Sequence, residues 1–202
     1  MLDVTGEHYF SAEPRVTERR REIGFTAAGR DFTLVTAGGV FSADRLDPGT
    51  AVLLRKAPLP EAGAAGPFLD LGCGYGPIAC VLATAVPKAT VYAVDVNARA
   101  RELAAENAVR VGAENIEVVA DIPDGVALAA IYSNPPIRIG KPELHAMLDR
   151  WLPRLAPGGV AWLVVARHLG ADSLQQWLVD RGRTVQRHAS QKGFRVLKVG
   201  DG

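Results

Sequence analysis

The chain contains little cysteine and no long apolar run. Its only cysteines, Cys73 and Cys80, cannot form a disulfide framework, and no cluster of cysteine and histidine residues has the spacing of a metal site. No segment approaches the roughly 20 apolar residues of a membrane-spanning helix, and the start, MLDVTGEHYF, lacks the basic and apolar regions of a secretory signal. We therefore expect a cytoplasmic protein without a bound metal or a membrane partner.

An excess of one charge is also absent. With a formal net charge of +1, the chain lacks the strongly basic balance of proteins that bind nucleic acid over their whole surface. Hydrophobic residues make up 48% of its 202 positions, which excludes a disordered chain and suits one domain with a substantial core. Basic residues nevertheless cluster twice, and each cluster is either a solvated face or part of an RNA-contacting surface. The clusters are Arg15, Arg19, Arg20 and Arg21 near the start, and Arg181, Arg183, Arg187, Lys192, Arg195 and Lys198 in the last quarter.

The most informative stretch is residues 68–76, FLDLGCGYG. A short apolar run containing an acid, Asp70, breaks into glycines at positions 72, 74 and 76. This pattern predicts a buried strand that turns into a loop before a helix. Because glycine has no β-carbon, a ligand could lie directly against the backbone of this loop. A tight turn without any ligand is the alternative.

The surroundings of the loop indicate which ligand it binds. A dinucleotide site has the pattern GxGxxG, and Pro77 stands where its last glycine would be. Asp95 ends the next apolar run, VYAVD, where a carboxylate can accept both hydroxyl hydrogens of a ribose. An acid before a GxGxG loop and an acid after the next strand resemble the class I S-adenosylmethionine (SAM) dependent methyltransferases. This resemblance implies SAM as the cofactor.

Apolar and amphipathic segments alternate between residues 67 and 202. The expected strands are 68–71, 90–95, 116–120, 128–133, 160–165, 184–188 and 194–199. The expected helices are 78–85, a segment capped by Asn97 and ended by Gly112, 142–155, and 173–180. This alternation favours a mostly parallel sheet with right-handed crossovers. Together with the resemblance, it predicts an α/β, Rossmann-like sheet of seven strands with helices on both faces.

Residues 1–60 are expected to form a small N-terminal extension, packed as one compact unit with the methyltransferase domain at 67–202. The extension starts as a polar arm with a short helix at 17–22. Residues 31–37 alternate like a strand and run through AGG into VFS, which suggests a hairpin. A helix should begin near Pro48, and the segment PLPEAGAAGP reads as a linker.

A second constellation, Asn134, Pro135, Pro136 and Ile137, follows the expected strand 128–133. The two prolines hold the chain extended and remove two backbone donors, which leaves carbonyl oxygens and the Asn134 side chain to face a ligand. A rigid corner rich in acceptors suits an amino group, and a strand ended by prolines is the simpler alternative. In a parallel sheet the corner should meet the glycine loop at the carboxyl ends of the strands.

The corner resembles the (D/N/S)PP(Y/F/W) signature of amino methyltransferases, which act on exocyclic nitrogens of bases or on glutamine amides. The segments HYFSAEP, GVFSADRLDPGT, DLGCGYGPI, NPPIRIGK and APGGVAWLVV also resemble, in the same order, the small methyltransferase domain of 16S ribosomal RNA guanine-N2 methyltransferases. This resemblance implies methyl transfer from SAM to the 2-amino group of a guanine. The implied partner is ribosomal RNA or the small ribosomal subunit.

The roles known for that family carry over to the matching positions. The implied SAM contacts are Asp70, Gly72, Cys73, Gly74, Gly76, Asp95, Val96, Asp121, Ile122 and Asn134. The implied catalytic clamp is Asn134 with Pro135, Pro136 and Ile137, and the implied substrate contacts are Phe41, Arg138 and Lys141. Ile137 departs from the signature, in which an aromatic ring stacks on the target base. Tyr9, Phe10 or Phe41 would then supply the ring.

Two other functions stay open at this point. One is N-methylation of another planar amine, such as adenine N6, a protein glutamine or a small molecule. The other is a non-catalytic module that binds SAM or RNA. Neither the target nucleotide nor the oligomeric state follows from the sequence, nor does the choice between naked RNA and an assembled subunit as substrate.

Overall fold

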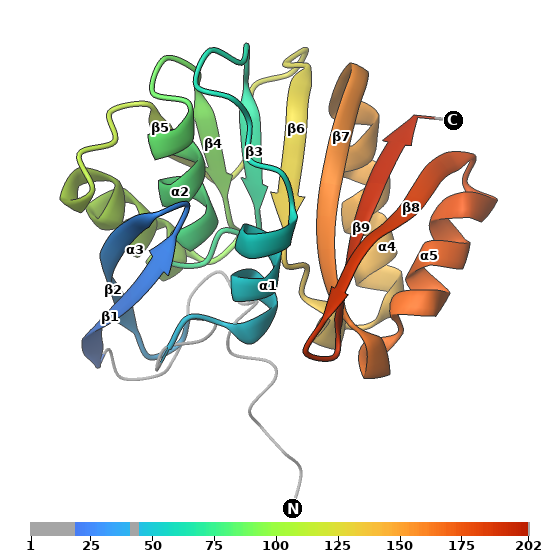
Figure 1. The fold of residues 1–202 in the computed structure, drawn as a ribbon, viewed down its shortest axis with the longest axis horizontal. Helices are drawn as coiled ribbons and strands as arrows, with labels where there is room; N and C mark the ends of the chain where they lie inside the picture. Colours follow the sequence, from blue (N-terminus) through green and yellow to red (C-terminus); the bar gives the residue numbers. More distant parts are fainter. Residues whose placement is uncertain (1–18, 41–44, 202) are drawn as a thin grey trace, which may run out of the picture.

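The computed structural model describes residues 19–40 and 45–201, and a seven-stranded sheet forms its centre (Figure 1). The strands lie in the order β5, β4, β3, β6, β7, β9, β8. Their bounds are β3 (Phe68–Leu71), β4 (Val91–Val94), β5 (Ile116–Val119), β6 (Leu128–Ser133), β7 (Leu155–Ala166), β8 (Arg183–Gln191) and β9 (Phe194–Asp201). β3 to β7 are parallel, whereas β9 runs antiparallel to both β7 and β8. The predicted Rossmann-like α/β sheet is confirmed.

Helices cover both faces of this sheet (Figure 1). One face carries α1 (Pro48–Lys56), α2 (Pro77–Ala85) and α3 (Ala98–Arg110), and the other carries α4 (Lys141–Trp151) and α5 (Ala171–Asp180). β3 and β4 are buried along their whole length. Strands between two helical layers have no face toward solvent, which explains the apolar composition of both segments.

A hairpin of β1 (Arg20–Ala27) and β2 (Arg30–Ala37) packs beside α3. The buried side chain of Asn107 on α3 holds it in place. Its amide accepts from the N–H of Val35 at 2.7 Å and donates to the carbonyls of Val35 and Tyr75, each at 2.8 Å. Because Tyr75 belongs to the glycine loop, this one side chain joins the hairpin, the helix and the loop.

One prediction for the hairpin region is wrong. Within the described residues, the predicted helix 17–22 is the start of strand β1, which pairs with β2. The polar composition of this segment favoured a helix, but pairing with β2 satisfies its backbone groups, and Arg20 and Glu22 reach charged partners on α3. The hairpin that the structure describes turns at Ala28 and Gly29. The predicted hairpin through AGG into VFS stays a prediction, because Phe41 and Ser42 lie outside the described residues.

The predicted helix 142–155 is too long and the predicted strand 160–165 is too short. α4 ends at Trp151, and one turn of 3-10 helix, Leu152–Arg154, leads into β7. Pro153 explains the early end, because it lacks an N–H donor and disfavours helical geometry at the preceding residue. Pairing of Leu155 with Leu128 then brings the chain into the sheet before its glycines.

The predicted starts of α1 and α3 are confirmed. Asp47 Oδ1 accepts from the N–H of Thr50 at 2.9 Å, and Asn97 Oδ1 accepts from the N–H of Ala100 at 3.2 Å, as N-cap side chains do. α1 packs against β7 and β9. The division into residues 1–60 and 67–202 stays a prediction. In the described part of the chain, no helix is long and apolar enough to cross a membrane.

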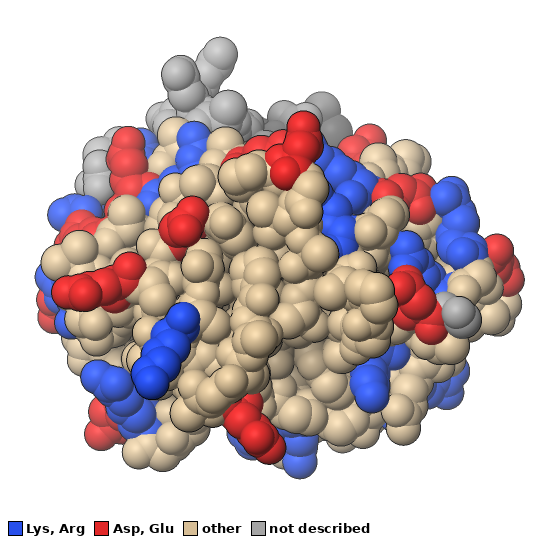
Figure 2. All heavy atoms as spheres, turned by 90° about the horizontal axis from the view of Figure 1, so that it is seen from above, with Lys and Arg blue, Asp and Glu red and all other residues tan. Residues whose placement is uncertain are grey.

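The carboxyl ends of β3, β4 and β6 point to one edge of the sheet, the lower edge in Figure 1. Figure 2 shows the opposite edge, where uncharged residues cover the centre and charged side chains lie mostly toward the rim. The polar residues that the sequence singled out follow the carboxyl ends of the strands, so any site that they form lies on the lower edge.

Candidate active site

A cavity lies at the carboxyl edge of the sheet, beside the glycine loop. Its volume is about 790 Å³ with the space at its open mouth included. The glycine loop, the ends of β4 and β5, the Asn134 corner and α4 contribute its walls. The predicted residues that line it are Gly72, Gly74, Asp95, Val96, Asn134 and Pro136. Two loops that are far apart in the sequence therefore meet at one cavity.

The glycine loop leaves open space where side chains would stand. Among the described residues, its chain neighbours aside, a β-carbon on Gly72 would meet no atom within 4 Å, and one on Gly74 would meet only Val40, at 4.0 Å. Both residues have positive φ, +73° and +56°, a conformation that favours glycine. The N–H groups of Gly72 and Cys73 both donate to the carbonyl of Val94 at 2.9 Å, which fastens the loop to β4. The loop can therefore bring its backbone against a ligand.

Asp95 is half-buried and is held by backbone donors. Its Oδ2 accepts from the N–H of Gly74 and its Oδ1 from the N–H of Asn97, each at 2.9 Å. Burial raises the pKa of Asp95, although these two bonds and the positive charge of Arg101 oppose the rise. A carboxylate offers about four lone-pair directions, so each oxygen can accept one further hydrogen. This geometry suits the two hydroxyl groups of a ribose.

Asp70 lies behind the glycine loop and does not line the cavity. It is fully buried, and its Oδ2 accepts from the N–H of Ala79 in the first turn of α2 at 2.9 Å. Burial raises the pKa of Asp70 to about 8; the bond from Ala79 opposes the rise, and the nearby charge of Asp95 adds to it. Its Oδ1 has no hydrogen-bond partner among the described residues. Asp70 therefore joins β3 to α2 in this structure.

Cys73 and Gly76 also lie outside the cavity wall. Cys73 is buried, and burial raises the pKa of its thiol well above the usual range. Gly76 precedes α2, and a β-carbon on it would stand 3.1 Å from the β-carbon of Ala104 on α3. Its absence lets two helices approach each other closely. These positions shape the loop from behind.

Asn134 stands at the cavity, immediately after β6. The preceding hydroxyl, of Ser133, donates to the carbonyl of Leu71 at 2.7 Å, which ties the end of β6 to the end of β3. The Asn134 side chain donates through Nδ2 to Asp47 Oδ1 at 2.6 Å and to Thr50 Oγ1 at 3.1 Å. The side-chain carbonyl of Asn134 therefore points away from α1.

The residues that follow Asn134 lie in different environments. Pro135 is buried, and its carbonyl accepts from the N–H of Ile137 at 2.8 Å, which leaves one of the two lone pairs of that oxygen. Ile137 does not line the cavity and packs against the core on the face of α4 and α5. Arg138 and Lys141 are exposed, and Lys141 Nζ donates to Ser173 Oγ at 3.1 Å. Only Asn134 and Pro136 of this group line the cavity.

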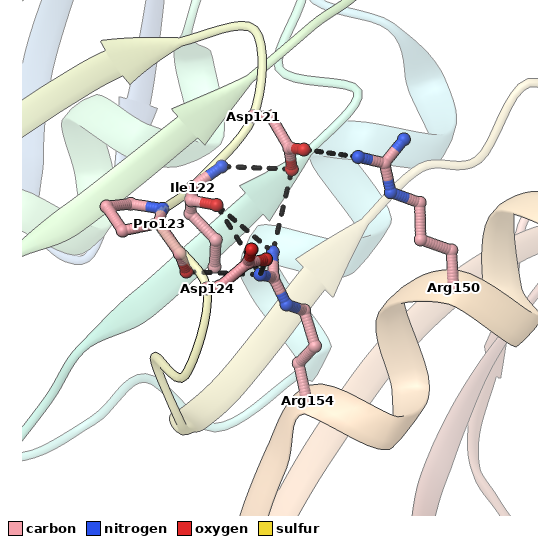
Figure 3. A network of polar contacts seen from close by, with 6 residues as sticks. All are labelled: Asp121, Ile122, Pro123, Asp124, Arg150 and Arg154. Carbon is pink, nitrogen blue, oxygen red and sulfur yellow. Dashed lines mark hydrogen bonds and ion pairs between the residues drawn. The ribbon is translucent and has the colours of Figure 1, made fainter.

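Asp121 follows β5, and its carboxylate points toward two arginine side chains (Figure 3). Its carboxylate pairs with Arg150 and, at 3.5 Å, with Arg154, and it accepts from the N–H of Ile122 at 3.0 Å. Its side chain is 45% exposed, whereas Ile122 is buried in the core. Neither residue lines the cavity, although the neighbouring Ala120 and the partner Arg150 do.

Several cavity residues were not predicted from the sequence. α4 contributes Met147, Arg150 and Trp151, which the sequence suggested only as parts of an amphipathic helix. The Asp47 carboxylate touches Asn134 from the start of α1. Its sequence signal was that of a helix cap, an acid before proline. The ring candidates Tyr9, Phe10 and Phe41 lie outside the described residues.

The sequence is similar to those of known proteins. The family model of the methyltransferase small domain matches residues 31–198. The uncharacterized protein YbxB of Bacillus subtilis is 34% identical over 198 residues, which are 96% of this chain and 98% of that protein. Ribosomal RNA small subunit methyltransferase C of Pseudomonas aeruginosa is also 34% identical, over 93% of this chain and 57% of its own length. Ribosomal RNA large subunit methyltransferase G of Streptomyces coelicolor has the same identity over 82% and 45%.

A solved structure shares the fold. The 16S rRNA N2 G1207 methyltransferase of T. thermophilus, determined with AdoMet and guanosine, superposes with a TM-score of 0.79 at 23% identity. The match covers 94% of this chain and 52% of that chain. This chain therefore spans about half the length of the ribosomal RNA methyltransferases that it matches.

The sheet order, the cavity beside a GxGxG loop and the family match together define a class I SAM-dependent methyltransferase. The chain belongs to the methyltransferase small domain family. The predicted class, fold and cofactor are confirmed.

Proposed function

We propose that this protein transfers a methyl group from SAM to the exocyclic 2-amino group of a guanine in 16S ribosomal RNA. The observation that carries the proposal is the Asn134 amide, whose nitrogen is occupied by α1 and whose oxygen is left to accept, at the cavity beside the glycine loop. Relatives named as ribosomal RNA methyltransferases support the choice of substrate.

The cofactor side of the site fits SAM. Gly72 and Gly74 leave room against the backbone, and Asp95 has free acceptor directions for the ribose hydroxyls. The exposed Val96 follows Asp95 at the cavity wall, where an adenine ring would lie. Bound there, SAM supplies a methyl group on a positively charged sulfur, which is already activated for transfer. The protein then needs mainly to position the amine that receives the methyl group.

An exocyclic amine is a weak nucleophile, because its lone pair is delocalised into the base. It carries two hydrogens, so it needs two acceptors and no donor. The Asn134 carbonyl oxygen is one. The other that we propose is the remaining lone pair of the carbonyl oxygen of Pro135, which is buried between the two wall residues Asn134 and Pro136. Accepting both hydrogens would pyramidalise the nitrogen and direct its lone pair at the methyl group. The positive charge that develops on this nitrogen is stabilised by the same two oxygens.

Contacts to RNA phosphates are proposed for Arg138 and Lys141, which are exposed beside the corner. The basic cluster in the last quarter of the chain contributes less to such contacts. Its arginines Arg181, Arg183, Arg187 and Arg195 pair with aspartates of the same chain. A phosphate would have to displace these partners before it gained an ion pair.

A ring to stack on the guanine is proposed from outside the Asn134 corner. Ile137 packs against the core and does not line the cavity. The position after the two prolines therefore offers no stacking surface here. Phe41 follows Val40, which does line the cavity, and it is the ring that we propose. Because the proposed substrate is ribosomal RNA, we also propose that the protein acts in the cytoplasm.

The test is methylation with labelled SAM of purified 30S subunits and, separately, of naked 16S rRNA. Digestion to nucleosides and mass spectrometry should find N2-methylguanosine. An Asn134→Ala variant should bind SAM but transfer methyl about 10² to 10³ times more slowly, since an acceptor for the developing charge is lost. Label found only in protein or small molecules, or in N6-methyladenosine, would contradict the proposal. So would unchanged turnover of the variant, which instead favours a non-catalytic module.

A guanine in 23S rRNA is the second candidate. The identity with a large subunit methyltransferase equals that with a small subunit methyltransferase. 50S subunits and naked 23S rRNA belong in the same assay for this reason. Labelling of 23S rRNA alone would move the target to the large subunit and keep the chemistry.

A further inference from the structure

The Asn134 side chain is held by a carboxylate from a different part of the chain. Asp47, the residue before α1, places Oδ1 at 2.6 Å from Asn134 Nδ2. Thr50 Oγ1, one helical turn further on, accepts from the same nitrogen at 3.1 Å. Both hydrogens of the Asn134 amide are therefore engaged by the start of α1.

This contact dictates which way round the amide stands. The two ends of an asparagine amide have nearly the same shape, but one donates and the other accepts. An ionised carboxylate only accepts, so the atom facing Asp47 must be the NH2 group. Turning the amide over would set its carbonyl oxygen against the Asp47 carboxylate and break both bonds. The opposite end, Oδ1, thus remains an acceptor beside the cavity.

We propose that Asp47 is a positioning residue for methyl transfer, which fixes the Asn134 carbonyl oxygen toward the amine of the substrate. The inference rests on the proposed function, because only an amine substrate requires an acceptor at this point. Without the Asp47 contact, the Asn134 side chain could turn its NH2 group toward the amine of the substrate. The N–H donors of the two groups would then face each other, and no hydrogen bond could form. Asp47 removes that orientation.

The negative charge of Asp47 also strengthens the acceptor. A carboxylate that accepts from one end of an amide polarises it and adds electron density to the carbonyl oxygen at the other end. During transfer the lone pair of the substrate nitrogen forms the new bond to the methyl carbon while the bond from carbon to sulfur breaks and its electron pair stays on sulfur. The nitrogen becomes positive and then releases one hydrogen to water as a proton. Asp47 exchanges no proton in this step.

The position of Asp47 is set by the start of α1. The same Oδ1 caps the helix by accepting from the N–H of Thr50 at 2.9 Å, and Pro48 occupies the first turn. A β-carbon on Gly49 would stand 2.9 Å from this oxygen and 3.0 Å from the Phe194 ring. The segment DPGT therefore holds one carboxylate oxygen between a helix end and the site.

The decisive variant is Asp47→Ser. Serine is a good helix cap, but its hydroxyl oxygen stands one bond closer to the backbone than the carboxylate oxygens of aspartate and does not reach Asn134. We expect single-turnover methyl transfer to slow by about 10²-fold, the scale of a misplaced reacting group, while SAM affinity by calorimetry stays within about twofold. Asp47→Asn, whose oxygen can still accept both bonds, should restore part of the rate. Asp124→Ser, which changes a fully exposed aspartate, is the matched control.

A double variant separates positioning from general stability. If Asp47 acts through Asn134, Asp47→Ser will cost nothing further in an Asn134→Ala background. Thermal unfolding of each variant reports whether α1 has loosened. A wild-type rate for Asp47→Ser would overturn the inference, as would a second full loss in the Asn134→Ala background.

A spectroscopic measurement tests the contact without any RNA. In ¹⁵N-labelled protein, the side-chain NH2 signals of Asn134, assigned by their absence in Asn134→Ala, should shift and exchange faster with solvent in Asp47→Ser. Unchanged signals would overturn the contact and with it the inference. If wild-type protein methylates no ribosomal RNA, the proposed function fails, and these signals still decide whether Asp47 orients Asn134.

Discussion

Asp95 and Asp121 follow neighbouring strands of one sheet, but the protein holds the two carboxylates in different ways. Backbone N–H groups of Gly74 and Asn97 hold Asp95 at the cavity wall. Mainly arginine side chains hold Asp121, outside the wall and partly in solvent. Figure 3 shows how Arg150 and Arg154 approach it from α4 and the turn that follows.

This difference indicates how far each carboxylate is organised before a ligand arrives. Backbone donors are fixed by the fold, so Asp95 is in place for a ribose without rearrangement. Arginine side chains on the surface can exchange one partner for another at low cost, since exposed ion pairs contribute little. A ligand amine could reach Asp121 only in competition with Arg150. We therefore expect SAM binding to depend strongly on Asp95 and weakly on Asp121.

Replacing Asp95 with alanine should produce the largest effect. Two charge-assisted hydrogen bonds to the ribose would be lost, each worth roughly 1.5 to 3 kcal/mol, so SAM affinity should fall by about 3 kcal/mol or more. Isothermal titration with SAM measures this directly. Asp124→Ala, at an exposed aspartate on the same edge, is the control. Affinity within about threefold of wild type would remove Asp95 from the ribose site.

Asp70 extends the comparison to a carboxylate with no access to solvent. Burial raises its pKa to about 8 in the folded protein, against about 3.9 in an unfolded chain. Between these values the folded state binds more protons than the unfolded state, so wild-type stability should fall as pH rises through this window. Asp70→Asn removes that dependence while its amide oxygen can still accept from Ala79.

Urea unfolding at pH 5, 6, 7 and 8 tests the Asp70 expectation. The free energy of unfolding of Asp70→Asn should rise relative to wild type by at most about 1.4 kcal/mol per pH unit. Parallel pH curves for the two proteins would contradict a raised pKa for Asp70.

The smallest effect is expected at Asp121. Its half-exposed carboxylate is screened by water and already has arginine partners, so Asp121→Ala should weaken SAM binding by about 1 kcal/mol or less. Arg150→Ala, the matched variant that removes only the exposed partner, should change stability by less than about 0.5 kcal/mol. Titration and urea unfolding measure the two effects. If Asp121→Ala lost as much SAM affinity as Asp95→Ala, the two carboxylates would not differ in their importance for SAM binding.

Helices and strands were predicted correctly where caps or apolar runs in the local sequence match the burial of the segment in the structure. β6 has the predicted bounds 128–133, and α3 begins after its Asn97 cap. The helix prediction for residues 17–22 failed because the charged residues of this segment do not indicate that it pairs with β2, which lies beyond a turn. The length of β7 was missed because its PGG segment read as a stop, whereas pairing with β6 extends the strand past it.

Some residues of the candidate site were predicted from the sequence and others were not, for the same reason. The glycine loop and Asp95 were identified because each is encoded within a few residues of one strand end. Their place at the cavity is now described, while their roles toward SAM stay predictions. Asp47, Arg150 and Trp151 were not assigned to the site, because each reaches it from a helix whose local sequence reports only capping or amphipathicity.

The sequence alone determined the kind of loop, the strand ends that carry acids and the stiff acceptor corner, because glycine, proline and short apolar runs restrict the backbone locally. The tertiary structure alone decided which carboxylates face the cavity and which partner each one has. Asp70 turned to the start of α2, Asp121 to the arginines, and Asp47 to Asn134. These choices depend on contacts between segments far apart in the chain, which no local preference of the residues can specify.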